Sequence, residues 1–212
     1  MTFPRNIRVD VPQLLECVQL NGIRTYAPWR EQFGGRTQLH ERELFKDQAR
    51  TVITELLDEL QEDDDGPLTQ AQNQARRRLV AQLFRELIDL KNRAITGCVH
   101  GSGLSKAKDS EWCHPLKGHD HQLGELRHPV LVDDEGTTDA WGWQFRMYFA
   151  APHVEPALIV FLVFGRKPIA RSEAEWAVVK RLQDGHIAQA CAEFLSWLEE
   201  RQIGHELPQG NQ

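Results

Sequence analysis

The fold is decided by residues 141–150 (WGWQFRMYFA) and residues 157–164 (ALIVFLVF), which a short loop with two prolines separates. In the first stretch, tryptophan, phenylalanine and methionine alternate with glycine and polar residues. This period of two predicts a strand with one buried face and one polar face. The second stretch is continuously apolar, which is typical of a strand that is buried on both faces. We therefore expect two antiparallel strands joined as a hairpin.

Two segments before these strands have apolar residues at helical spacing. The first runs from about residue 41 to the acidic run at residues 62–65, and the second runs from its cap at Thr69 to Gly97. The apolar faces contain Leu44, Val52, Ile53, Leu56, Leu57 and Leu60 in the first segment, and Leu79, Val80, Leu83, Phe84, Leu87, Ile88 and Leu90 in the second. Because few residues join the two segments, they predict an antiparallel helical hairpin over residues 41–96.

A third helix is predicted near the C-terminal end of the chain. Ser172 and Glu175 form an S-x-x-E capping box that opens it. Its expected apolar face consists of Trp176, Val179, Leu182, Ile187, Ala190, Phe194 and Leu198. Residues 1–40 are broken by prolines and glycines, which indicates an irregular extension. The complete expectation is an α+β fold, in which the helical hairpin (residues 41–96) packs on a small antiparallel sheet followed by the C-terminal helix (residues 97–212).

Composition narrows the class of protein. The 212 residues include 31 acidic and 25 basic side chains, for a net charge of -6, and 41% are hydrophobic. These values are ordinary for a globular protein and exclude general disorder. No apolar run approaches the roughly 20 residues that cross a bilayer, and no export signal is evident, so a cytoplasmic protein with four reduced cysteines is expected. The acidic balance argues mildly against nucleic-acid binding.

Histidines and cysteines gather in the middle of the chain and could suggest zinc. The group is Cys98, His100, Cys113, His114, His119, His121 and His128. Its spacing matches no common zinc pattern and includes no C-x-x-C pair. A polar loop that happens to contain histidines is therefore the favoured interpretation, and no metal or cofactor is expected.

Basic residues on or beside the predicted sheet are the sharpest chemical signal. They are Lys117, Arg127, Arg146, Arg166 and Lys167, and Tyr148 shares the polar strand face with Arg146. Cationic side chains on an open sheet face can bind phosphate and stabilise charge that develops at phosphorus. Exposed basic residues on strands are also common, because they blunt sheet edges. From the residues alone, this second interpretation is favoured.

Four short motifs favour the first interpretation, in which the basic residues bind phosphate. They are residues 116–118 (LKG), residues 123–127 (LGELR), residues 143–149 (WQFRMYF), and residues 158–164 closed by 165–168 (GRKP). In this order, and after the helix pair, they resemble the RelE/ParE toxin superfamily, in particular its HigB-like branch. The resemblance covers about residues 41–182.

The resemblance implies a microbial toxin of a toxin–antitoxin pair that cleaves mRNA on the ribosome without a metal ion or other cofactor. A small antitoxin protein, the ribosome and mRNA would be its partners. Arg146 would stabilise the phosphate, either Arg166 or Lys167 would supply a second cation, and Tyr148 would be a candidate for proton transfer. The expected RNA contacts are Lys117, Arg127 and His128.

Several departures from the family keep a second function open. Leu123 and Glu125 replace a lysine pair that some members carry, and Trp176 lies near the place of a catalytic tyrosine. The chain is about twice the usual toxin length, and most of its acidic excess lies after residue 96. The alternative is a non-catalytic interaction module of the same fold, either a ParE-like topoisomerase inhibitor or a partner-binding protein. The apolar face of the hairpin would then bind a partner helix or a second copy of the chain.

Overall fold

A computed structural model describes residues 38–59, 69–101, 110–116, 122–128, 143–170 and 172–201 of the chain. The elements, in chain order, are β1 (Gln38–Glu41), α3 (Glu43–Glu59), α4 (Gln70–Thr96), β2 (Trp112–Cys113), β3 (Leu123–His128), β4 (Trp143–Ala150), β5 (Leu158–Pro168) and α5 (Glu173–Glu200). The expected α+β class, with a helix pair before the sheet strands and a helix after them, is confirmed. Most of the expected N-terminal extension lies outside the described residues, and its last residues form β1 instead.

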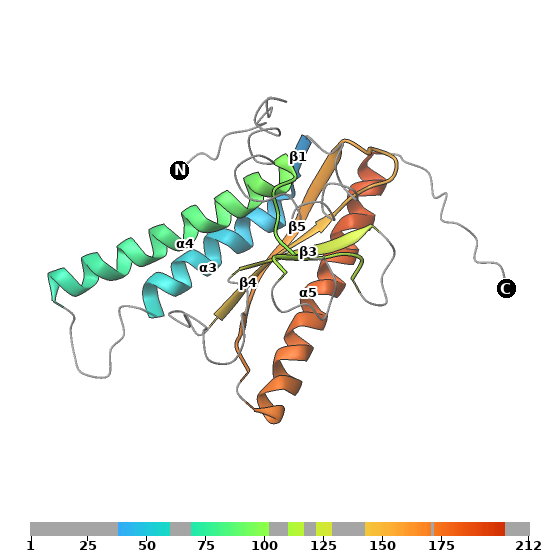
Figure 1. Cartoon of the computed structure of the whole chain (residues 1–212). Helices are drawn as coiled ribbons and strands as arrows, with labels where there is room; N and C mark the ends of the chain where they lie inside the picture. The colour runs from blue at the N-terminus through green and yellow to red at the C-terminus, as the bar shows by residue number, and fades with distance from the viewer. Residues whose placement is uncertain are drawn as a thin grey trace.

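The five strands form one sheet in the order β1-β5-β4-β3-β2 (Figure 1). Neighbours from β5 to β2 are antiparallel, as expected, but β1 pairs with β5 in parallel, with Gln38 opposite Leu158. The sheet is therefore mixed, and the expectation of a purely antiparallel sheet is wrong. β1 has only four residues, too few for a clear alternation, and a parallel pair requires a long crossover that sequence spacing does not reveal.

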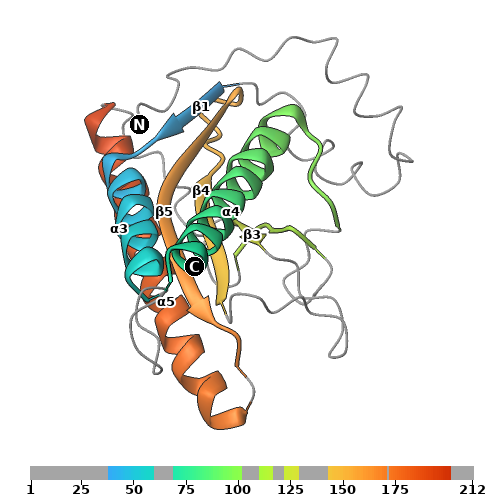
Figure 2. The ribbon, with the colours of Figure 1, turned by 90° about the vertical axis from the view of Figure 1, so that its left-hand side faces the viewer.

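Helices cover both faces of the sheet. α3 and α4 lie side by side and antiparallel on one face, while α5 crosses the other face (Figures 1 and 2). One apolar cluster joins α3 and α4 to the first face through residues such as Leu83, Phe145 and Phe161. A second cluster joins α5 to the opposite face through residues such as Leu162 and Phe194. The sheet is thus the middle layer of three.

The polar face of β4 is not open to solvent, which corrects the prediction from its alternating sequence. Gln144, Arg146 and Tyr148 are all buried. They point away from α3 and α4, as the period of two requires, but α5 lies over them. A pattern of alternating polarity identifies two different faces, and it does not identify which of them meets water.

The helices α4 and α5 begin at the capping residues that the sequence predicted, and α4 ends at the predicted glycine. The Thr69 side chain accepts a hydrogen bond from the Gln72 backbone in a capping box at the start of α4, and Gly97 ends that helix with φ of 78°. Ser172 accepts from the Glu175 backbone at the start of α5.

The buried face of α5 differs partly from the expected one. It contains Val179, Ile187, Ala190, Phe194 and Trp197. Trp176 and Leu182, which were expected on it, are exposed. The first half of α5 therefore contacts the sheet through fewer apolar side chains than the second half.

Two further observations bear on the class of protein. Cys113 and Cys191 are free thiols, whereas Cys98 belongs to a disulfide whose partner lies outside the described residues. The expectation of four reduced cysteines is therefore wrong at Cys98. None of the helices in the described part of the chain combines the length and the apolar character needed to cross a membrane.

Candidate functional site

A group of polar and charged side chains lies between the sheet and α5. We call it the ionic cluster and define it as Glu125 and Arg127 of β3, Gln144, Arg146 and Tyr148 of β4, and Lys167 of β5. The strand register brings these residues together, because Arg127 lies opposite Arg146 and Gln144 lies opposite Lys167. All six side chains are buried.

Glu125 is the centre of the ionic cluster. Only 1% of the residue is exposed, and its Oε1 accepts hydrogen bonds from Arg127 Nε at 2.9 Å and from Arg146 Nη1. Burial by itself would raise the pKa of this carboxyl, but the two guanidinium groups outweigh burial and lower the pKa. Glu125 is therefore the ionised counter-charge of the cluster.

Arg146 and Tyr148 each keep one polar atom without a hydrogen-bond partner among the described residues. Arg146 donates to Glu125 and, at 2.7 Å, to Gln144 Oε1, but none of these residues accepts a hydrogen bond from its Nε. The Tyr148 hydroxyl is fully buried and likewise has no partner in the described part of the chain. Burial, with Glu125 nearby, raises the pKa of Tyr148, so its hydroxyl keeps the proton at neutral pH. Unpaired buried polar atoms are unusual and often mark sites of function.

Lys167 completes the ionic cluster on β5. Its Nζ donates to Gln183 Oε1 at 3.3 Å and lies 5.5 Å from the centre of the Trp176 ring. Burial, followed by the charge of Arg146, lowers the pKa of Lys167 to about 7. The amine can therefore gain or lose a proton near neutral pH, which is a common property of acid–base groups in active sites.

Side chains of α5 cover the ionic cluster. Gln183 donates to Glu125 Oε2 at 3.5 Å, and the His186 ring lies 5.9 Å from the Tyr148 ring. Gly165 makes this close approach of the helix possible, since a Cβ atom there would lie 2.6 Å from His186. Neither Gln183 nor His186 was predicted as a site residue from the sequence. Their signal was the presence of two polar side chains, three residues apart, beside the apolar face of the predicted helix.

Two of the predicted site residues lie on the opposite face of the sheet. Arg166 donates to Glu55 at 3.0 Å and to Glu59 at 2.9 Å, both on α3. His128 contacts Glu86 of α4 at 3.0 Å. Of the predicted site residues, the structure thus groups Arg146, Lys167, Arg127 and Tyr148 and separates Arg166 and His128 from them. Lys117 lies outside the described residues.

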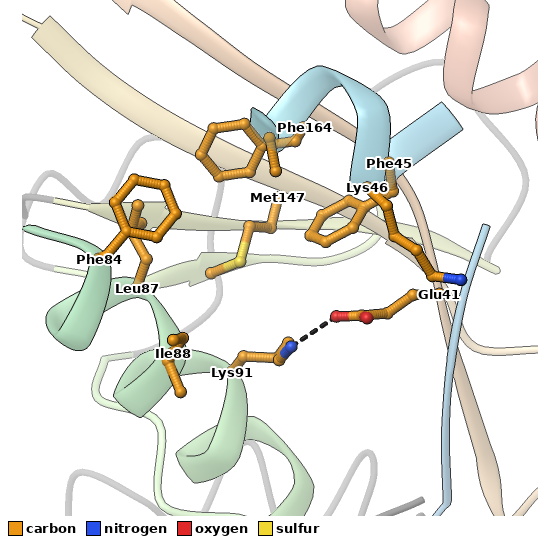
Figure 3. A pocket seen from close by; sticks show the side chains of 10 residues that line it. Glu41, Phe45, Lys46, Phe84, Leu87, Ile88, Lys91, Met147 and Phe164 are labelled. Atoms are coloured by element: carbon orange, nitrogen blue, oxygen red, sulfur yellow. Dashed lines mark hydrogen bonds and ion pairs between the residues drawn. The ribbon is translucent and has the colours of Figure 1, made fainter. Parts of the chain in front are cut away.

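The α3 and α4 side of the sheet contains a small pocket (Figure 3). Its volume is about 40 Å³, and it is lined by Glu41, Phe45, Lys46, Ala49, Phe84, Leu87, Ile88, Lys91, Met147 and Phe164. The ion pair between Lys91 and Glu41 closes one end. The remaining walls are mainly apolar, so the pocket is suited to packing against one apolar side chain.

The described residues contain neither a metal-binding group nor an activated Cys113. Within the described ranges, no three histidine, cysteine or carboxylate side chains are grouped so that they could hold a metal ion. His119 and His121 lie outside these ranges. Cys113 is buried, and burial raises the pKa of its thiol, which is the opposite of what a nucleophilic cysteine requires.

The chemistry of the ionic cluster follows from its charges. Arg127 and Arg146 both donate to Glu125, and Lys167 adds a third cation when it is protonated. A buried group of positive charges favours an anion, because few water molecules are present to screen it. No protein-family model, curated protein or solved structure matches this chain.

Proposed function

We propose that this chain is a toxin-like protein that cleaves RNA without a metal ion, and that the ionic cluster is its site of cleavage. The observation that carries this proposal is the convergence of Arg127, Arg146 and Lys167 on one face with Glu125 as the carboxylate that balances them. The transition state of RNA cleavage is anionic at phosphorus, so such a cluster would stabilise it. The order of the helix pair and of the motif-bearing strands β3, β4 and β5 adds support.

Three residues of the ionic cluster have roles in this reaction that fit their environments. Lys167, with a pKa of about 7, would accept the proton of a ribose 2′-hydroxyl. The 2′-oxygen would attack the adjacent phosphorus and form a cyclic phosphate, the bond from phosphorus to the 5′-oxygen would break, and that oxygen would take the proton that Lys167 had accepted. Arg146 would bind the phosphate through its unpaired Nε. Tyr148 keeps its proton and would donate a hydrogen bond, rather than move protons as the resemblance implies.

RNA would reach the ionic cluster only after the first half of α5 moves. The second half is firmly held, because Arg42 donates to Glu193 and Glu200, and Phe194 and Trp197 are buried. Gly185 marks the junction between the halves, and a Cβ atom there would meet nothing within 4 Å. The proposed partners are a small antitoxin protein, the ribosome and mRNA, and binding of one of them would control this movement.

Expression in a bacterial host, followed by assays of the purified chain, tests the proposal. Labelled RNA would be incubated with the protein in EDTA, with and without translating ribosomes. We expect growth arrest and RNA cleavage, and we expect Arg146→Ala to reduce cleavage about 100-fold or more. Arg166→Ala is the matched control, since that arginine lies on the opposite face, and it should cleave normally. Absence of both arrest and cleavage would show that the proposal is wrong.

A non-catalytic interaction module is the second candidate function. One observation favours it: Glu125 accepts hydrogen bonds from Arg127, Arg146 and Gln183 beneath α5, as it would in a purely structural cluster. The pocket between α3 and α4 would then accept an apolar side chain of a protein partner or of a second copy. Growth arrest with intact RNA, unchanged by Arg146→Ala, would support this function. A topoisomerase supercoiling assay and light scattering would then separate a ParE-like inhibitor from a partner-binding dimer.

A further inference from the structure

The first half of α4 does not pack on the sheet. The buried residues of this helix begin at Val80, and none of the residues from Gln70 to Leu79 is buried. Figure 1 shows this part of α4 projecting beyond the sheet, on the side away from β1. A helical segment that buries no apolar face gains little from the rest of the fold, so its exposed side chains require another explanation.

The solvent-facing side of α4 is basic from Gln70 to Arg85. It consists of Gln70, Ala71, Gln74, Arg77, Arg78, Ala81, Gln82 and Arg85, all of them exposed. At 3.6 residues per turn, Arg78 and Arg85 lie in line, about 10 Å apart, and opposite the buried Val80 and Leu83. The first acidic residue of α4 is Glu86. We call Arg77, Arg78 and Arg85, with the glutamines between and before them, the arginine face.

No carboxylate of the described residues pairs with the arginines of this face. Most other arginines in the described part of the chain make ion pairs, as Arg50 does with Asp47. Within that same part, no ion pair involves Arg77, Arg78 or Arg85. Because the whole chain carries a net charge of -6, four to five helical turns without a carboxylate are a marked local concentration of positive charge.

The chemistry of the arginine face fits an RNA backbone better than a protein. Arginine and glutamine are among the side chains that contact phosphate and ribose. The alanines leave room for a backbone to approach between them. Protein interfaces generally include apolar or aromatic side chains at their centre, and the arginine face has none.

The arginine face and the ionic cluster lie toward the same end of the sheet. Glu86, next to Arg85, contacts His128, the last residue of β3. Gln144 and Lys167 lie near this end as well, at the start of β4 and close to the end of β5. A strand of RNA that bound the arginine face could therefore continue around the end of the sheet.

We propose that the arginine face binds the phosphate backbone of single-stranded RNA and holds the strand for the ionic cluster. The substrate assignment rests on the proposed function, whereas the binding itself does not require cleavage. Binding and cleavage are separated with a fluorescent 2′-O-methyl RNA of about 20 nucleotides. This RNA has no free 2′-hydroxyl and cannot be cleaved by the proposed route.

Fluorescence anisotropy over a range of salt concentrations measures this binding. The triple variant Arg77→Gln, Arg78→Gln and Arg85→Gln keeps polar, helix-compatible side chains, so the fold should persist. We expect its affinity to fall at least tenfold and the slope of log affinity against log salt to become shallower by about 2, since each lost phosphate contact removes about 0.7. The control is Lys180→Gln with Arg181→Gln, two exposed cations of α5, which should bind as the unchanged protein does.

Three results would overturn this inference: unchanged affinity and salt slope in the triple variant, an equal loss in the control, or equally tight binding of polyglutamate through the same arginines. The unchanged protein separates the two proposals when it is given both RNAs. Ordinary RNA reports cleavage, whereas the 2′-O-methyl RNA reports binding alone. If the unchanged protein binds this RNA through the arginine face but never cleaves ordinary RNA, the proposed function is wrong and the binding surface stands.

Discussion

The two faces of the sheet are built from alternate residues of the same strands, and their chemistry differs most along β4, although the face beneath α5 also carries an apolar cluster. On β4, Phe145 and Met147 join the apolar cluster beneath α3 and α4, while Arg146 and Tyr148 belong to the ionic cluster beneath α5. Both faces are buried. Alternation along a strand therefore distinguished an apolar environment from a charged one, and not a buried face from an exposed one.

The two faces should respond differently to substitution. The apolar face depends on packing, so each loss is limited by the size of the cavity that it leaves. The charged face depends on the balance of Arg127, Arg146 and Glu125, so removal of one group takes an ion-pair partner away from a buried charge. Substitutions on the two faces, ordered by decreasing effect, test this difference.

Glu125→Gln should have the largest effect. It leaves two guanidinium groups buried without their carboxylate, and we expect the free energy of unfolding to fall by about 3–5 kcal/mol. Urea denaturation followed by circular dichroism would measure it. Glu55→Gln, which weakens an ion pair of Arg166 with a largely exposed carboxylate, is the control and should cost less than about 1 kcal/mol. Equal losses would contradict the view that the charged face depends on Glu125.

Leu83→Ala tests the apolar face. Leu83 is fully buried in the cluster between α4 and the sheet, so the substitution should lower the free energy of unfolding by about 3 kcal/mol. Leu79, one turn earlier on α4, is 44% exposed, and Leu79→Ala should have little effect in the same urea titration. A large loss at Leu79 would show that the first half of α4 packs against something.

Lys167→Met tests the pH dependence of the charged face. The folded pKa of Lys167 is about 7 and its ordinary value is 10.5, so the unfolded chain binds more protons between these pH values. Stability should therefore rise with pH above 7, by up to about 1 kcal/mol per pH unit, and the penalty for a buried cation should be complete below pH 7. Urea titrations at pH 7, 8 and 9 should show that Lys167→Met removes this rise, whereas Lys180→Met retains it.

Two glycines near the ionic cluster give the smallest expected effects, and these have opposite signs. Gly185→Ala should stabilise the protein by about 0.5–1 kcal/mol, because alanine favours a helix and nothing lies within 4 Å of its Cβ. Gly165→Ala should destabilise it, since the new Cβ forces His186 away from Tyr148. Thermal unfolding would compare the two variants. A loss of stability in Gly185→Ala would indicate that the helix needs flexibility at this position.

Much of the fold could be predicted because its signals are local. Thr69 and Gly97 end α4 through side-chain and backbone preferences that act within one helical turn. Ser172 does the same for α5. The parallel pairing of β1 and the cover formed by α5 were missed, because both depend on contacts between residues far apart in the chain.

The candidate site could likewise be predicted only where the signals are local in the sequence. The grouping of Arg146 with Tyr148 followed from the period of the strand. The choice between Arg166 and Lys167 did not follow, because adjacent residues point to opposite faces and the strand register decides which of them joins the cluster. That register includes an irregularity between Tyr148 and Phe149, which no local pattern reveals. His186 and Gln183 were missed since only the packing of α5 brings them to the sheet.

The parallel pair of β1 and β5 also has a consequence for how the nascent chain acquires its structure. Gln38 leaves the ribosome long before Leu158, its partner in the sheet. α3 and α4 are likewise complete before the strands that bury their apolar faces have been made. Such long-range pairing slows folding and leaves apolar surface exposed during synthesis. We therefore expect the growing chain to depend on chaperones until β5 has emerged.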